Sequence, residues 1–252
     1  MEFVLLCGIF CIISITLLFF FLTLFKKINR INEIKNRANY QIKIDALLFE
    51  LLFGNRNISD VIDSPEFLQY KDSQLFQHLT IKALIGLHNS YSGIYRIKLE
   101  QFFACSGLAS YCVEKLNSKN WSHIVEGIRD LSSLNYLPAY PRIVSYQNHK
   151  NRFVQTEVFL GMIKLKGIAE LFKFQTSKVY FNDWVQSNIL FVVKNNNLPA
   201  PENLSELLDS KNTSVVLLAV RLINYYGIQE HYAKLSVVHQ NMGDPKLKKE
   251  IV

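Results

Sequence analysis

The residue types that bind metals or attack substrates are few and scattered in this 252-residue chain. Its six histidines lack the H-x-x-x-H or C-x-x-C spacing that places two ligands on one metal ion. No G-x-S-x-G nucleophile motif, P-loop or G-x-G-x-x-G dinucleotide motif occurs. We therefore predict no catalytic residue, no cofactor-binding site and no metal site, and we do not expect an enzyme.

The remaining reactive side chains have plainer explanations. Glu126 and Asp130 lie four positions apart, with Arg129 beside them, and this pattern is more typical of a solvated helix face than of an acid/base pair. Cys105 and Cys112 would lie about 10.5 Å apart along one helix, beyond the Cα separation of about 6.8 Å that a disulfide allows. We expect two buried free thiols.

The composition indicates an ordered helical protein. Hydrophobic residues make up 49% of the chain and aromatic residues 13%, which argues against disorder, and the 10 Gly and 6 Pro exclude collagen-like and low-complexity classes. Apolar residues recur at three- and four-residue steps over 75–88, 94–116 and 121–134, with Gly107 dividing the second stretch. No run alternates in a strand-like way, so we predict an all-α fold.

Residues 1–25 resemble a membrane anchor in their hydropathy. Phe3–Phe25 has 23 positions without a charge, and a helix of this length would span about 34 Å, more than the bilayer core of about 30 Å. A signal peptide would begin with basic residues, whereas this chain begins Met1-Glu2. We therefore predict an uncleaved transmembrane helix.

Basic residues follow this apolar run and predict its orientation. Lys26, Lys27 and Arg30 come directly after it, and most of the net charge of +7 falls within residues 26–43. By the positive-inside rule, the N-terminus should lie outside and the C-terminal domain in the cytoplasm, as a single-pass protein of the cell (inner) membrane. Residues 26–53 would form a basic helical stalk whose Lys26, Lys27 and Arg30 contact the membrane surface.

The last third of the chain repeats with a regular period. Similar segments, each preceded by a polar turn, start at Val154, Val185, Val215 and Leu247. The first and third close in Gly167 and Gly227, as helices often do. A period of about 31 residues predicts stacked helical pairs over residues 120–252, with residues 54–119 following the pattern loosely. Because the chain stops at Val252, we expect its last repeat to be truncated.

A helix that opens after a polar turn and closes in Gly at this period resembles the second helix of a HEAT repeat. Asp244-Pro245 resembles the turn of that family, and Ala219 matches its small residue, whereas Val158 and Ile189 are larger. The resemblance, to the bacterial membrane-anchored type, implies an α-solenoid after the transmembrane helix. It also implies a protein partner, with a membrane glycosyltransferase of envelope polysaccharide assembly as one candidate.

Solenoids present extended surfaces and typically bind other macromolecules. We therefore expect a membrane-tethered scaffold or adaptor for protein–protein interaction at the cytoplasmic face. Tyr136, Tyr140 and Trp184 are candidate partner-binding residues, although such rings also cover helix ends. The alternatives are a nucleic-acid-binding HEAT-like protein, which the position of the basic residues disfavours, and an enzyme acting on a membrane-associated substrate. No small-molecule substrate is evident.

Overall fold

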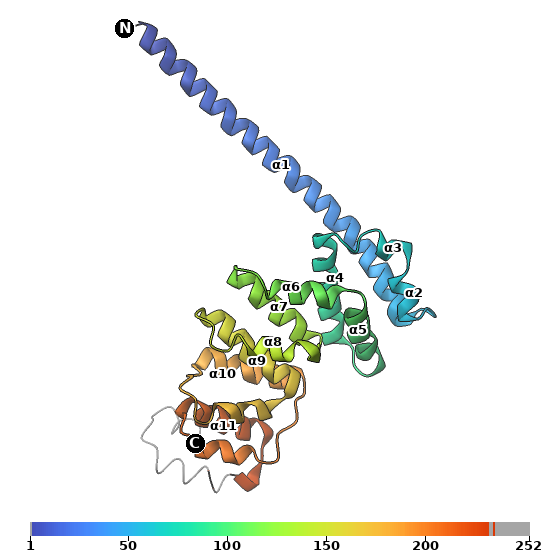
Figure 1. Ribbon diagram of the computed structural model, residues 1–252, viewed down its shortest axis with the longest axis vertical. Coiled ribbons are helices and arrows are strands. Elements are labelled where there is room, and N and C mark those ends of the chain that lie inside the picture. Colours follow the sequence, from blue (N-terminus) through green and yellow to red (C-terminus); the bar gives the residue numbers. More distant parts are fainter. Residues whose placement is uncertain (1, 232–233, 235–252) are drawn as a thin grey trace. The chain divides into compact units, whose positions relative to one another are not determined.

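A computed structural model of the chain describes residues 2–231 and residue 234, and every regular element among them is helical. The predicted all-α fold is therefore confirmed for this part of the chain. The chain divides into two compact units, Met1–Phe102 and Phe103–Val252, and each is described by itself (Figure 1).

The first unit is built on one continuous helix, α1, which covers both the predicted anchor and the predicted stalk. It ends at Phe53, followed by Gly54, where the sequence predicts a stop. Shorter helices pack on its second half, and a buried aromatic cluster that includes Phe67 and Phe76 fills the space between them. The helices are α1 (Glu2–Phe53), α2 (Ile58–Ile62), α3 (Pro65–Leu68), α4 (Gln74–Ser90) and α5 (Ile94–Cys105).

The predicted transmembrane helix at Phe3–Phe25, and with it the single-pass location, is contradicted. In the described part of the chain, no helix is both long enough and apolar enough to cross a bilayer.

The second unit pairs long helices with short ones. Helices α7, α9 and α10 pack in succession, while α6 packs on α7, α8 on α9 and η3 on α11. In Figure 1 the helices of this unit follow one another in chain order from green to red. They are α6 (Leu108–Lys115), α7 (Trp121–Ser133), η1 (Leu137–Ala139), α8 (Tyr140–Val144), α9 (Arg152–Lys166), η2 (Ile168–Phe174), α10 (Asp183–Asn195), η3 (Leu204–Asp209), α11 (Thr213–Tyr226) and η4 (Gln229–His231).

Each of the four long helices in the described part of this unit begins at an asparagine cap. The side-chain oxygen of the cap accepts a hydrogen bond from a backbone N–H of the first turn, and the caps are Asn120, Asn151, Asn182 and Asn212. This bond satisfies a donor that the helix start would otherwise leave unpaired. The repeating segments predicted from Val154, Val185 and Val215 lie in α9, α10 and α11. The fourth, from Leu247, lies outside the described residues.

Glycines mark the predicted helix ends. Gly107 separates α5 from α6 with φ of 85°, and Gly227 ends α11 with φ of 64°, a left-handed conformation that side chains disfavour. The elements that precede α10 and α11 are 3₁₀ helices of 7 and 6 residues, η2 and η3. They are shorter than the helices that a HEAT repeat implies.

Candidate interaction surface

Three exposed aromatic side chains occupy the first or second position of three successive long helices. Trp121 begins α7, Phe153 is the second residue of α9 and Trp184 is the second residue of α10. Their exposed fractions are 43%, 58% and 57%. We call these three residues the aromatic row.

The local sequence explains why these rings face water. Each ring comes one or two positions after an asparagine cap, in the first helical turn. In α9 and α10 the next position is already part of the core, because Val154 follows Phe153, Val185 follows Trp184, and both valines are buried. In α9 the cap bond from the Phe153 N–H to Asn151 Oδ1 measures 2.8 Å. The caps and the buried valines therefore hold the backbone of the row in place.

Two rings of the row are in direct contact. The planes of Trp121 and Phe153 are inclined by 20°, and their centroids lie 5.3 Å apart. This offset stack joins the N-terminal ends of α7 and α9 and leaves the outer faces of both rings exposed. A stacked pair of this kind presents a large, rigid apolar area to solvent.

Cations surround the aromatic row. Basic residues precede or follow three of the asparagine caps directly, and one more lies in the segment before α10. All are exposed, and none makes an ion pair with another described residue; they are Lys119, Lys150, Arg152, Lys178 and Lys211. The carboxylate of Asp183, beside Trp184, lies 3.2 Å from the guanidinium of Arg221. The unpaired charge around the row is therefore positive.

A groove of about 530 Å³ lies between the first half of α9 and residues 177–181. Arg152 and Lys178 line it, together with Tyr180 and the amide of Gln155, and its described lining contains no Asp or Glu. We call it the Arg152–Lys178 groove. Because Arg152 precedes Phe153 in the chain, this groove opens beside the aromatic row.

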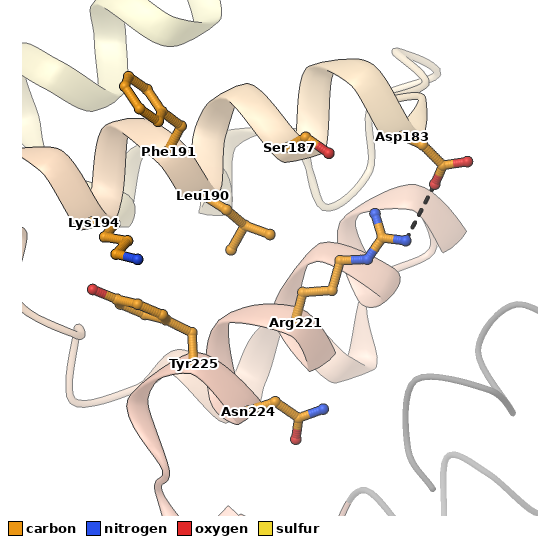
Figure 2. Close-up of a pocket in the computed structure, with 8 residues that line it drawn as sticks. All are labelled: Asp183, Ser187, Leu190, Phe191, Lys194, Arg221, Asn224 and Tyr225. Atoms are coloured by element: carbon orange, nitrogen blue, oxygen red, sulfur yellow. Dashed lines mark hydrogen bonds and ion pairs between the residues drawn. The ribbon is translucent and has the colours of Figure 1, made fainter.

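A second groove, of about 610 Å³, lies between α10 and α11 (Figure 2). Phe191 and Tyr225 are exposed at 65% and 45%, and Figure 2 shows Lys194 and Tyr225 extending toward one another across it. At its other end Arg221 pairs with Asp183, and its Nη1 donates to Gln186 Oε1 at 2.9 Å. In this second groove Arg221 and Asp183 form an ion pair with each other. The cations of the Arg152–Lys178 groove have no such partner among the described residues.

The predicted partner-binding residues lie in different environments. Tyr136 is half-buried and packs edge-on against Phe103, with centroids 5.9 Å apart. Tyr140 is buried, its hydroxyl donates to Glu170, and Lys166 lies 4.1 Å from its ring centroid. These two rings cover helix ends. Trp184, in contrast, is exposed on the aromatic row.

Burial and the hydrogen bond to Glu170 raise the pKa of Tyr140. Its hydroxyl therefore stays protonated at neutral pH and acts as a hydrogen-bond donor inside the unit. Lys173 donates to the same oxygen at 2.8 Å. The arrangement is a hydrogen-bond network between α8 and η2.

The basic residues predicted to contact a membrane lie on α1. Lys26, Lys27 and Arg30 are exposed and make no ion pair with any described residue. Their contact with a membrane surface stays a prediction.

The acidic residues Glu126 and Asp130 belong to an internal ion network. Lys115 Nζ lies 3.1 Å from Glu126 and 3.0 Å from Asp130, and Asp130 is buried, so the expected solvated face is wrong for this residue. Both carboxylates bind the same ammonium group, from α6. The network stabilises the contact between α6 and α7.

One of the two cysteines differs from the prediction of two buried free thiols. Cys105 is exposed, whereas Cys112 is buried on the next helix, and both are free. Burial, followed by the charge of Asp130, raises the pKa of the Cys112 thiol. A thiol in this state is a poor nucleophile at neutral pH.

Sequence reasoning identified Trp184 but not Trp121 or Phe153. The sequence held a usable signal: an asparagine followed within two residues by an aromatic residue, repeated about every 31 residues. The two missed residues stand at the start of apolar stripes, where a ring is easily assigned to the core. Only the structure, in which Trp121 at the start of α7 stacks on Phe153 at the start of α9, shows that the two rings lie on one exposed edge.

Comparison with known proteins found no match among family models, curated proteins or solved structures. The resemblance to HEAT repeats therefore gains no support from relatives.

Proposed function

We propose that the second unit is a helical-repeat scaffold of the α-solenoid kind that binds a segment of another protein on its aromatic row. The asparagine caps support the repeat architecture, because they recur about every 31 residues, a period within the range of helical-repeat proteins. Each repeat would pair a short helix with a long one, so that equivalent positions of the long helices fall along one edge. The exposed Trp121, Phe153 and Trp184 occupy that edge.

The observation that carries the proposal is the stacked and exposed pair Trp121 and Phe153. Tryptophan is enriched among residues that dominate binding energy, and large rings contribute because they bury wide apolar areas. Covering apolar surface is favourable by about 25 cal/mol per Å². If the rings of the row are already held in place, ordering them on binding costs little conformational entropy.

The test is a selection of random 12-residue peptides, displayed on phage, against the immobilised full-length chain. Captured peptides are then measured on a variant with Trp121→Ala, Phe153→Ala and Trp184→Ala. Phe191→Ala is the matched control, because Phe191 is equally exposed on α10 but lies outside the row. Far-UV circular dichroism establishes that each variant is folded.

We expect peptides whose affinity falls at least about tenfold in the row variant, as truncation of central aromatic residues usually causes, and stays unchanged in Phe191→Ala. Peptides that bind both variants equally, or the absence of any captured peptide, would contradict the proposal.

A further inference from the structure

We infer that the bound segment is acidic, and that one of its carboxylates enters the Arg152–Lys178 groove between Phe153 and Trp184. This inference rests on the proposed function and deepens it, because it specifies the chemistry of the partner. Two cations line the groove, and its described lining holds no carboxylate to neutralise them.

Several basic residues of this unit already bind a carboxylate of the unit, and Arg152 and Lys178 differ from them. Arg129 lies 2.7 Å from Glu157, Arg221 lies 3.2 Å from Asp183, and Lys115 binds two carboxylates. Arg152 and Lys178 have no such partner among the described residues. An incoming carboxylate would therefore meet cations that no internal acid already occupies.

The wall of the groove that carries Lys178 is fixed by α11. Asn212 Nδ2 donates to the carbonyl oxygens of Ser177 and Val179 at 3.0 and 2.7 Å, on either side of Lys178. The Phe181 N–H donates to Ser214 Oγ at 3.0 Å. The backbone at Lys178 is thus held before any ligand arrives, which lowers the entropic cost of binding.

Two residues that line the groove are sequence neighbours of rings of the aromatic row. Arg152 is adjacent to Phe153 in α9, and Val185, which also lines the groove, is adjacent to Trp184 in α10. An extended peptide that covers these two rings would therefore pass over the groove. Lys119 and Lys150, each directly before an asparagine cap, add positive charge along the same edge.

The geometry of the rings favours a peptide over single-stranded nucleic acid. Nucleic-acid platforms stack successive bases on separate aromatic rings. Here Trp121 and Phe153 stack on each other at 5.3 Å, so they form one joint platform and not two separate ones. Nucleic acid is therefore retained only as an outcome of the test.

The experiment first determines the net charge of the selected peptides from their sequences. One peptide that depends on the row is then synthesised with its Asp and Glu residues, and again with Asn and Gln in their place. Both forms are titrated against the full-length chain and the double variant Arg152→Gln, Lys178→Gln. The control is Lys82→Gln with Lys194→Gln, which removes the same charge from exposed lysines outside the groove.

We expect the selected peptides to carry net negative charge. The acidic form should bind the groove variant at least about fivefold more weakly than the wild type, since the variant loses charge-assisted hydrogen bonds to the carboxylate. The control variant should keep most of the affinity. The amide form should bind weakly, and equally, to the wild type and the groove variant, as expected when one interaction is removed from either side.

The results that would overturn the inference differ from those that would overturn the proposed function. Neutral or basic peptides that still require the row, or equal losses in the groove and control variants, would refute the acidic partner and leave the scaffold intact. No row-dependent peptide at all would refute both. Row-dependent binding of a 12-nucleotide oligothymidylate without any row-dependent peptide would also refute both, in favour of nucleic acid.

Discussion

The indole ring of Trp121 on α7 stacks on the phenyl ring of Phe153 on α9, with the centroids 5.3 Å apart. The two residues are separated by one repeat of the asparagine cap, so the contact shows that the starts of neighbouring long helices lie level with each other. Trp184 occupies the same place on α10, one repeat further on. The sequence period of about 31 residues therefore places the rings of the aromatic row at the starts of successive long helices.

The asparagine caps should differ in their contribution to stability according to how many bonds each makes. Asn212 caps α11 and also donates to carbonyl oxygens of residues 174–179, while Asn120 is exposed and bonds only within its own turn. We expect Asn212→Ala to lower the free energy of unfolding by about 2–4 kcal/mol and Asn120→Ala by about 1 kcal/mol. Urea denaturation of both variants measures the difference. Equal losses would show that the additional bonds of Asn212 contribute nothing.

The contact between α6 and α7 should depend on the absence of a side chain at Gly127. A Cβ atom there would lie 2.8 Å from the carbonyl oxygen of Cys112, whereas one at Gly86 of α4 would meet no atom within 4 Å. Gly127→Ala should therefore destabilise the protein by about 1–3 kcal/mol. Gly86→Ala should stabilise it by about 0.5–1 kcal/mol, because alanine favours the helix. Thermal unfolding of the two variants tests this, and a harmless Gly127→Ala would disprove the close packing.

Lys164 should make stability depend on pH in a defined direction. Burial lowers the pKa of its ammonium group from 10.5, and its Nζ donates to Ser133 Oγ at 3.1 Å. The folded state therefore releases this proton at a lower pH than the unfolded state. Its stability should rise as the pH increases through the lowered pKa toward the unfolded value.

Replacing Lys164 with methionine removes this dependence. We expect Lys164→Met to raise the melting temperature at pH 7, where the buried charge is unfavourable, and to raise it less at pH 10. The exposed Lys194→Met serves as the control. A gain that is the same at both pH values would show that the charge of Lys164 is not responsible.

Helix boundaries were predictable because local chemistry determines them. The end of α1 before Gly54, the break at Gly107 and the cap of α3 by Ser64 all follow from residues within one turn. The period of α9, α10 and α11 was also visible, because each long helix begins after a polar turn. The predicted anchor was contradicted, since no helix in the described part of the chain is long and apolar enough to cross a membrane.

The candidate surface was less predictable because it depends on tertiary contacts. Tyr140 and Trp184 have the same apparent character in the sequence, yet Tyr140 donates to Glu170 inside the unit while Trp184 faces solvent. Glu170 lies 30 residues away from Tyr140, so no local pattern reveals the pairing. The Arg152–Lys178 groove likewise depends on a distant contact, because Asn212, the cap of α11, binds the carbonyl oxygens on either side of Lys178.

The most direct test of the proposed scaffold uses the tryptophan fluorescence of the protein itself. The chain contains two tryptophans, Trp121 and Trp184, and both belong to the aromatic row. Emission is recorded while a selected peptide is titrated into the full-length chain, and the anisotropy of a label on the peptide reports binding independently. We predict a blue shift of the emission that saturates together with the anisotropy, because the peptide covers the exposed indoles. Saturating anisotropy with unchanged emission would show that the partner binds elsewhere and would contradict the aromatic row as the binding surface.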